Sequence, residues 1–279
     1  MTRMSYHIGE QFEKVVFVLS SGRTGTTAIA RYLDEGCRGV RALHEPTPSR
    51  TLRIASGRYL AGKQKPKDMI RLLWRARHKL CGEIDEAVYV ESNPFLYGFL
   101  DALGEVFDSP RVVHVVRDPR TMIRSALNFG AQRGLKWLAN TFVPYWLIKP
   151  EHLHFAPERR WRQMSAVERI AWYWSVINAH LNRGEELYGE LYRRVRYEDL
   201  FAEDGGGVRE LIDWIGLEER PGELDKRMQQ RINESRHAEL PEWPAWPAAD
   251  RQAVEHHCGE LMGRYGYVES TFESHRVDG

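Results

Sequence analysis

The chain has 279 residues, of which 42% are hydrophobic and 28% are charged, and its formal net charge is +1. This is the composition of an ordinary globular protein at the upper size for one hydrophobic core, so we expect one domain with a long insertion. Because the total charge is so close to zero, it does not indicate nucleic acid or an acidic polymer as the main partner.

The cysteines and the N-terminus indicate the compartment. Cys37, Cys81 and Cys258 are an odd number at wide spacings, which is typical neither of a disulfide framework nor of a paired metal site. The N-terminus lacks an apolar signal core, and no stretch approaches the roughly 18 apolar residues needed to span a bilayer. We therefore expect a cytoplasmic protein, although a chain without its membrane anchor would look the same.

The first predicted element is a buried strand at residues 15–19, which reads Val-Val-Phe-Val-Leu and ends in the turn residues Ser20-Ser21-Gly22. From Thr26 the apolar residues change to helical spacing, and the pattern stops at Gly36. The sequence therefore predicts a strand, a glycine-containing loop and a helix.

Further strands and helices alternate along the chain. Strands are predicted at 87–90, 112–116 and 195–197, with helices at 94–107, 119–129 and 166–187. Strands that alternate with helices and are apolar on both faces predict a parallel sheet covered on both sides. The predicted fold class is α/β, with a central parallel sheet flanked by helices in a single domain that spans residues 1–279.

Two stretches fit this alternation poorly. Residues 50–80 are rich in Lys and Arg, and residues 130–165 are rich in aromatic residues among prolines and histidines. Long irregular segments of compact domains are usually functional loops, lids or disorder, and the aromatic content argues against disorder. We expect both to be insertions beside the site that binds the substrate. Within 63–79, a solvated helix face is favoured over contact with anionic lipid or an acidic glycan.

Residues 20–27, Ser-Ser-Gly-Arg-Thr-Gly-Thr-Thr, have the composition of a phosphate-binding loop. Glycines let the backbone turn around an anion, the helix N-terminus directs N–H groups at it, and hydroxyls add donors. A Walker A loop would have a lysine directly before the last hydroxyl residue; here the cation comes earlier, as Arg23. Taken alone, the loop is equally consistent with a tight turn and a capped helix.

A second group of polar residues follows the strand predicted at 112–116. Arg117-Asp118-Pro119-Arg120 comes directly after it, and Ser125 lies eight residues after Arg117. An arginine at a strand end and a hydroxyl on the next helix can converge on one phosphate, because ligands of open α/β sheets bind at this edge. The alternative is a local salt bridge between Arg117 and Asp118.

These two motifs resemble the phosphosulfate loop and the 3′-phosphate motif of the sulfotransferases that use 3′-phosphoadenosine 5′-phosphosulfate (PAPS). Similar segments continue through 91–94, 196–200 and 263–267, so the resemblance covers nearly the whole chain. It implies a P-loop-like nucleotide fold. It also implies that Arg117 and Ser125 hold the 3′-phosphate and that the first loop holds the phosphosulfate, through Arg23, Thr24, Gly25, Thr26 and Thr27.

The sequence departs from the cytosolic aryl and steroid members of that family, which have a lysine in the first loop and a basic, glycine-rich segment near the C-terminus. Arg23 resembles the carbohydrate-type and bacterial branches instead. Arg236 is the candidate for a late cation that would contact the cofactor.

His44 and Glu45 are the candidates for the catalytic base, because they follow an expected second strand at the same sheet edge as the phosphate loop. The resembled family uses either a histidine or a glutamate, and Glu45, which precedes a proline, is favoured over His44. The alternative is a strand-capping histidine beside a solvated carboxylate. His114 is interpreted as a core residue, and the adjacent spacing of His256, His257 and Cys258 does not favour a metal site.

The resulting prediction is a sulfotransferase that moves the sulfonyl group of PAPS to a hydroxyl or amine by in-line displacement, with Arg23 as the cation and no metal. The acceptor is expected to be a carbohydrate or natural product, and neither its identity nor the oligomeric state follows from the sequence. Two alternatives remain open: a P-loop-type kinase or nucleotide hydrolase, and a nucleotide-binding protein without catalysis.

Overall fold

The computed structural model describes residues 6–8, 11–130, 134–153, 160–202, 205–228 and 241–267, without the side chains of 134–137 and 227–228. Arg236 lies outside these residues. No helix in this part of the chain is long and apolar enough to cross a membrane.

The centre of the molecule is a five-stranded sheet in the order β2-β3-β1-β4-β5. All four pairings are parallel, and Val16 of the central strand faces Val90 on one side while Val18 faces Val113 on the other. The strands are β1 (Lys14–Ser20), β2 (Val40–His44), β3 (Val88–Ser92), β4 (Arg111–Val116) and β5 (Tyr192–Arg196). The predicted α/β fold with a parallel sheet is confirmed.

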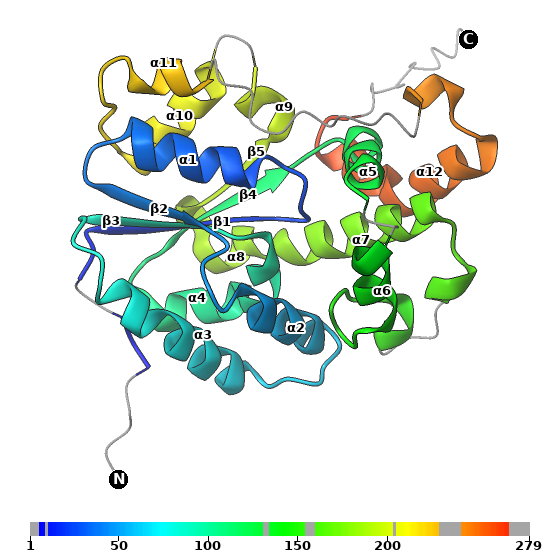
Figure 1. The fold of residues 1–279 in the computed structure, drawn as a ribbon, viewed down its shortest axis with the longest axis horizontal. Helices are drawn as coiled ribbons and strands as arrows, with labels where there is room; N and C mark the ends of the chain where they lie inside the picture. The colour runs from blue at the N-terminus through cyan, green and yellow to red at the C-terminus, as the bar shows by residue number, and fades with distance from the viewer. Residues whose placement is uncertain are drawn as a thin grey trace, which may run out of the picture.

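Helices cover both faces of this sheet, as Figure 1 shows. One layer is α1 (Thr26–Gly36), α9 (Tyr197–Leu200), α10 (Gly206–Ile215) and α11 (Glu223–Met228). The other contains α2 (Ser49–Leu60), α3 (Pro66–Cys81), α4 (Leu100–Val106), α7 (Ala166–Leu181) and α8 (Gly184–Tyr188). Beyond the end of the sheet lie α5 (Pro119–Asn128), α6 (Gly134–Phe142) and α12 (Ala248–Arg264).

The central strand shows why the sequence selects this arrangement. Phe17 and Leu19 point into the core beneath α4 and α7, whereas Val16 and Val18 point into the core beneath α1 and α10. Successive side chains of a strand face opposite sides, so a strand that is buried on both faces has to be apolar throughout.

The structure changes the predicted boundaries of two helices. The helix predicted at 166–187 ends at Leu181, and α8 follows as a separate turn. Gly184 sits at that break, where a Cβ would lie 2.4 Å from the ring of Tyr192, so only glycine fits. The helix predicted at 94–107 begins as a 3-10 turn, η1 (Pro94–Phe99), before α4.

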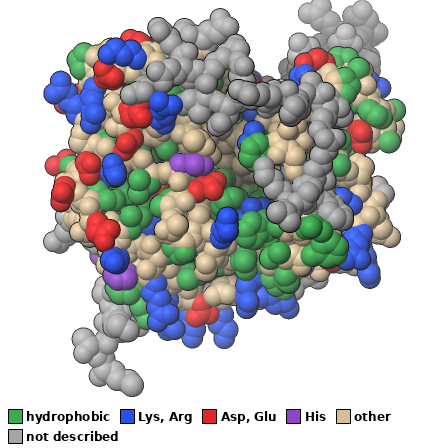
Figure 2. Space-filling model, in the orientation of Figure 1, with side chains coloured by type: hydrophobic (Ala, Val, Ile, Leu, Met, Phe, Trp, Pro, Cys, Tyr) green, Lys and Arg blue, Asp and Glu red, His purple; other side chains and the backbone are tan. Residues whose placement is uncertain are grey.

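The basic stretch at 50–80 is regular rather than irregular, because it forms most of α2 and α3. Met69, Leu73 and Cys81 are the buried apolar positions of α3, at helical spacing. Lys67, Arg71, Arg75 and Lys79 are exposed. Figure 2 shows Lys and Arg side chains gathered along the edge of the molecule where α2 and α3 lie in Figure 1.

Candidate active site

The loop between β1 and α1 has the backbone of an anion site. Gly22, Arg23 and Gly25 all have positive φ, at 89°, 58° and 72°. Helix α1 begins at Thr26 with no side-chain cap and no acidic residue in its first turn. Gly25 is also sterically required, since a Cβ there would lie 2.5 Å from the ring of Phe201. The first N–H groups of α1 therefore remain available to an anion.

The two arginines predicted to bind phosphate lie together beside this loop. Arg117 Nη1 donates to the Arg23 carbonyl at 2.8 Å, and Arg23 Nε lies 3.3 Å from Ser125 Oγ. Among the described residues, neither guanidinium forms an ion pair with a carboxylate. Burial lowers the pKa of Arg23, and the charge of Arg117 lowers that pKa further. The structure thus brings two adjacent cations together, and no carboxylate of the described chain lies between them.

Asp118 is not the partner of Arg117, so the local salt bridge left open by the sequence is absent from this described segment. The Asp118 carboxylate accepts from the backbone N–H of Arg120 at 2.8 Å, which caps α5, and also accepts from the Arg120 guanidinium. Arg117 lies instead over the ring of Tyr197, 4.1 Å from its centroid. Its carbonyl accepts from Trp174 Nε1 at 3.0 Å. These contacts fix the backbone and the side chain of Arg117, and no carboxylate of the described chain neutralises its charge.

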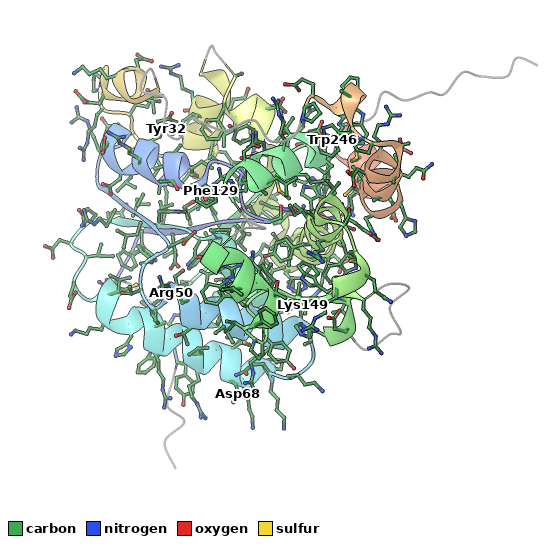
Figure 3. The ribbon with its side chains drawn as sticks, turned by 45° about the vertical axis from the view of Figure 1, so that its right-hand side comes forward. Tyr32, Arg50, Asp68, Phe129, Lys149 and Trp246 are labelled. Carbon is green, nitrogen blue, oxygen red and sulfur yellow. The ribbon has the colours of Figure 1, made fainter. Side chains whose placement is uncertain are left out.

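The far side of Arg23 is covered by Phe129, the residue that ends α5. Its ring centroid lies 4.1 Å from the Arg23 Cζ, and the side chain is 54% exposed. Figure 3 shows the labelled Phe129 between α1 and α5. The electron-rich face of the ring attracts the guanidinium and so favours its charged form.

The threonines of the loop differ in environment. Thr24 is buried, and no atom of the described chain hydrogen-bonds to its Oγ1. Thr26 is buried at the start of α1, whereas Thr27 is exposed. A buried hydroxyl without a partner is costly, and a phosphate oxygen would satisfy it. Together with the uncapped helix and the two unpaired guanidiniums, this fits a ligand that carries several phosphate-like groups.

His44 lies directly beside the loop, at the end of β2. Its Nδ1 lies 3.0 Å from the Ser92 carbonyl, which can only accept, so Nδ1 carries the proton in the neutral ring. Its Nε2 lies 3.0 Å from Thr27 Oγ1 and, as the acceptor nitrogen, receives the threonine hydroxyl. The single lone pair of neutral His44 is therefore engaged by Thr27.

Glu45 is the next residue, with a positive φ of 45° and a side chain that is 33% exposed. Its backbone N–H donates to the Ser92 carbonyl at 3.2 Å. One carboxylate oxygen lies 3.4 Å from His44 Nε2, and no described group donates a hydrogen bond to the carboxylate. The structure thus brings Thr27, His44 and Glu45 together at the carboxyl end of the sheet.

A family model described as the sulfotransferase family matches residues 15–221, which contain both loops and the pair at the end of β2. The chain belongs to the sulfotransferase family. No protein in the curated collection of known sequences matches it.

Solved sulfotransferases share the fold of this family member over most of both chains. The sulfotransferase domain from the curacin biosynthetic pathway is 16% identical, with a TM-score of 0.52 over 90% of this chain and 98% of that one. The sulfotransferase domain from the Synechococcus PCC 7002 olefin synthase is 14% identical, with a TM-score of 0.54 over 93% and 97%. Mouse sulfotransferase SULT7A1, solved in complex with PAP, is 9% identical, with a TM-score of 0.52 over 93% and 88%.

The sequence did not identify Arg77, which this sulfotransferase uses to hold the segment after Glu45. Arg77 had been grouped with the solvated cations of 63–79, but it is fully buried. Its guanidinium pairs with both oxygens of Glu91, each at 2.6 Å, and also donates to the carbonyls of Pro46 at 3.3 Å and Thr47 at 3.1 Å. Burial opposes its charge, but Glu91 outweighs burial and raises the pKa of Arg77. The sequence did contain one signal of this burial, because Arg77 follows Met69 and Leu73 at four-residue spacing and so lies on the same face of the helix.

The remaining polar candidates of this sulfotransferase lie away from the site or could not be placed. His114 is buried in β4 between the Tyr192 hydroxyl at 2.7 Å and Asn178 Oδ1 at 2.8 Å, as expected of a core histidine. Burial lowers the pKa of His114 to about 3. No group of three or more metal-ligating side chains occurs within the ranges that the structure describes. Arg236 falls outside those ranges, so its predicted contact stays a prediction.

Proposed function

We propose that this chain transfers the sulfonyl group of PAPS to a hydroxyl or amine of a small acceptor. The observation that carries the proposal is the pair of adjacent guanidiniums, Arg23 and Arg117, which lie beside an uncapped helix N-terminus without a carboxylate partner in the described chain. Two neighbouring cations repel each other, and an anion with two phosphate-type groups relieves that repulsion.

The donor would be held by residues from both motifs. Arg23 and the first turn of α1 would contact the 5′-phosphosulfate, with hydroxyl donors from Thr24, Thr26 and Thr27. Arg117 and Ser125 would contact the 3′-phosphate. Charge-assisted hydrogen bonds of this kind are about twice as strong as neutral ones.

PAPS supplies an activated sulfonyl group: a bond forms between its sulfur and the acceptor oxygen or nitrogen, the sulfur–oxygen bond to the 5′-phosphate breaks, and the electron pair stays on that phosphate oxygen. Arg23 would stabilise the charge that develops there. The acceptor proton would move to a protein base as the new bond forms. No redox partner is needed, because the oxidation state of sulfur does not change.

Glu45 is the better base on the geometry, as the sequence favoured. The lone pair of neutral His44 receives the Thr27 hydroxyl, whereas no described residue donates a hydrogen bond to Glu45. His44 would orient the Thr27 hydroxyl.

The experiment is a calorimetric titration with the desulfonated product, 3′-phosphoadenosine 5′-phosphate (PAP), in the absence of metal. Wild type should bind at micromolar concentration, and Arg117→Ala should weaken binding by about tenfold or more, roughly 1.5–3 kcal/mol. Arg111→Ala is the matched control, because Arg111 lies at the opposite end of β4 and contacts Trp214. Absence of binding, or a preference for ATP with magnesium, would contradict the proposal and favour a kinase or hydrolase.

A further inference from the structure

Arg53, one turn into α2, is a further arginine that forms no ion pair with a described carboxylate. Its guanidinium lies between two aromatic rings, with Cζ 4.4 Å from the centroid of Phe95 and 4.4 Å from that of Trp146. Its Nε donates to the Trp146 carbonyl at 2.7 Å. The planar group therefore contacts two aromatic rings and is held along its Nε edge.

The outer edge of this guanidinium is not used by the described chain. Neither Nη group has a hydrogen-bond acceptor there, and Arg53 forms no ion pair with any described carboxylate. Burial lowers the pKa of Arg53, and this effect is opposed by the Tyr173 and Tyr97 hydroxyls and by the Glu45 carboxylate. The groups that influence the charge of Arg53 are thus Tyr173, Tyr97 and the proposed base, Glu45.

These residues converge on one side of Glu45. Helix α2 begins at Ser49, directly after the Glu45 segment, and Phe95 lies in the turn that follows β3. Helix α2 packs closely on the aromatic segment, since a Cβ on Gly57 would lie 2.4 Å from the Tyr145 carbonyl. The loop between β1 and α1 reaches the two candidate bases through the contact of Thr27 with His44.

We propose that Arg53 binds a carboxylate of the acceptor, so that the substrate class is a hydroxy acid or an amino acid with an apolar or aromatic body. The free Nη edge matches the two oxygens of a carboxylate, and the Phe95 and Trp146 rings provide the apolar surface beside it. This inference rests on the proposed sulfonyl transfer. The acceptor would then be recognised where α2, η1 and residues 143–149 contact one another.

A purely structural role for Arg53 would need only its bond to the Trp146 carbonyl. Arg77 is an example of a structural arginine in this protein, and its charge is neutralised by Glu91. Burying a guanidinium against two rings costs free energy in the unliganded protein, and the Glu45 carboxylate offsets only part of that cost, since burial has the larger effect and lowers the pKa of Arg53. An acceptor carboxylate removes that cost, so it should be bound preferentially.

The test compares matched carboxylate and amide acceptors, such as para-hydroxyphenylacetate with its amide and beta-hydroxybutyrate with its amide. Binding of each probe to the PAP-loaded protein is measured by calorimetry, and transfer is measured with radiolabelled PAPS. Wild type should favour the carboxylate member by about tenfold or more, as expected for a charged hydrogen bond. Arg53→Gln should abolish this preference, because its affinity for the carboxylate member should fall to that for the amide.

Arg50→Gln is the matched control, since Arg50 is exposed on the same helix and is labelled in Figure 3. It should retain the carboxylate preference. The inference is overturned if no carboxylate exceeds its amide in wild type, if Arg53→Gln keeps the preference, or if that variant lowers the thermal midpoint and weakens both members equally. Titration with PAP alone separates these results from failure of the proposed function, because it reads the donor site without an acceptor.

Discussion

Two regions of this protein differ in whether a carboxylate neutralises their arginines. In the layer below β3, Arg77 is fully buried and forms a two-pronged ion pair with Glu91, to which Tyr89 and Asn93 also donate hydrogen bonds. At the end of β1 and β4, Arg23 and Arg117 contact each other with no described carboxylate beside them. A buried charge that the protein neutralises itself supports the fold, whereas one that it leaves without a counter-ion is available to a ligand.

The largest effect expected from this comparison is on stability. Arg77→Met leaves Glu91 buried without its cation, so the free energy of unfolding should fall by about 3–5 kcal/mol. This corresponds to a decrease in thermal midpoint on the order of 10 °C. Arg117→Met removes one of two repelling charges and should leave the midpoint nearly unchanged.

Calorimetric or fluorescence melting of both variants measures this difference. The double variant Arg77→Met with Glu91→Leu leaves no unpaired charge, so it should lose less stability than Arg77→Met alone. Equal losses for Arg77→Met and Arg117→Met would show that the two environments do not differ as argued.

The next effect concerns Glu45, which lies between the two regions. Glu45→Gln keeps the shape of the side chain but removes the proposed base, so sulfonyl transfer should fall by about 100-fold or more. The affinity for PAP should stay within about twofold, because the nucleotide contacts come from the two loops. Rates with radiolabelled PAPS and PAP titrations on the same preparation give both quantities. A Glu45→Gln enzyme of wild-type rate would move the role of base to His44.

The smallest effect is a pH dependence that belongs to the fold alone. Burial holds the pKa of His114 at about 3, below its ordinary 6.5, so the unfolded chain binds this proton more readily than the folded one. Stability should therefore fall as pH decreases below about 6.5, by roughly 1.5 kcal/mol at about pH 5. His180, whose pKa burial lowers to about 4, contributes in the same direction.

Urea unfolding at the two pH values measures this loss. His114→Gln retains a donor for Asn178 and an acceptor for the Tyr192 hydroxyl, so it should flatten the pH dependence without unfolding the protein. An unchanged slope in that variant would contradict the assignment.

The strands and the donor loops could be predicted because their signals are local. An apolar strand, a glycine turn and a helix start follow one another within 15–27, and the apolar strand at 112–116 is likewise followed directly by polar residues and a helix. Fold class and the order of these elements follow from alternation alone.

The partners of the charged groups could not be predicted, since they depend on contacts between distant segments. Arg53 meets Trp146 at a separation of 93 residues, and Arg117 meets Arg23 at 94. Arg77 shares the helical spacing of Met69 and Leu73, which separates it from Arg75, but its partner Glu91 can be recognised only in the folded chain. The same limit applied to Phe129 and Tyr197, whose rings meet Arg23 and Arg117 only in the folded chain.

The most direct test of the central claim is a set of titrations with PAP and with AMP, which lacks the 3′-phosphate. We predict that Arg117→Met weakens PAP by about tenfold or more but leaves AMP nearly unchanged, whereas Arg23→Met weakens both nucleotides. Wild type should bind PAP more tightly than AMP, and the Arg117 variant should lose most of that difference. Equal binding of PAP and AMP by wild type, or a difference that survives Arg117→Met, would contradict the account.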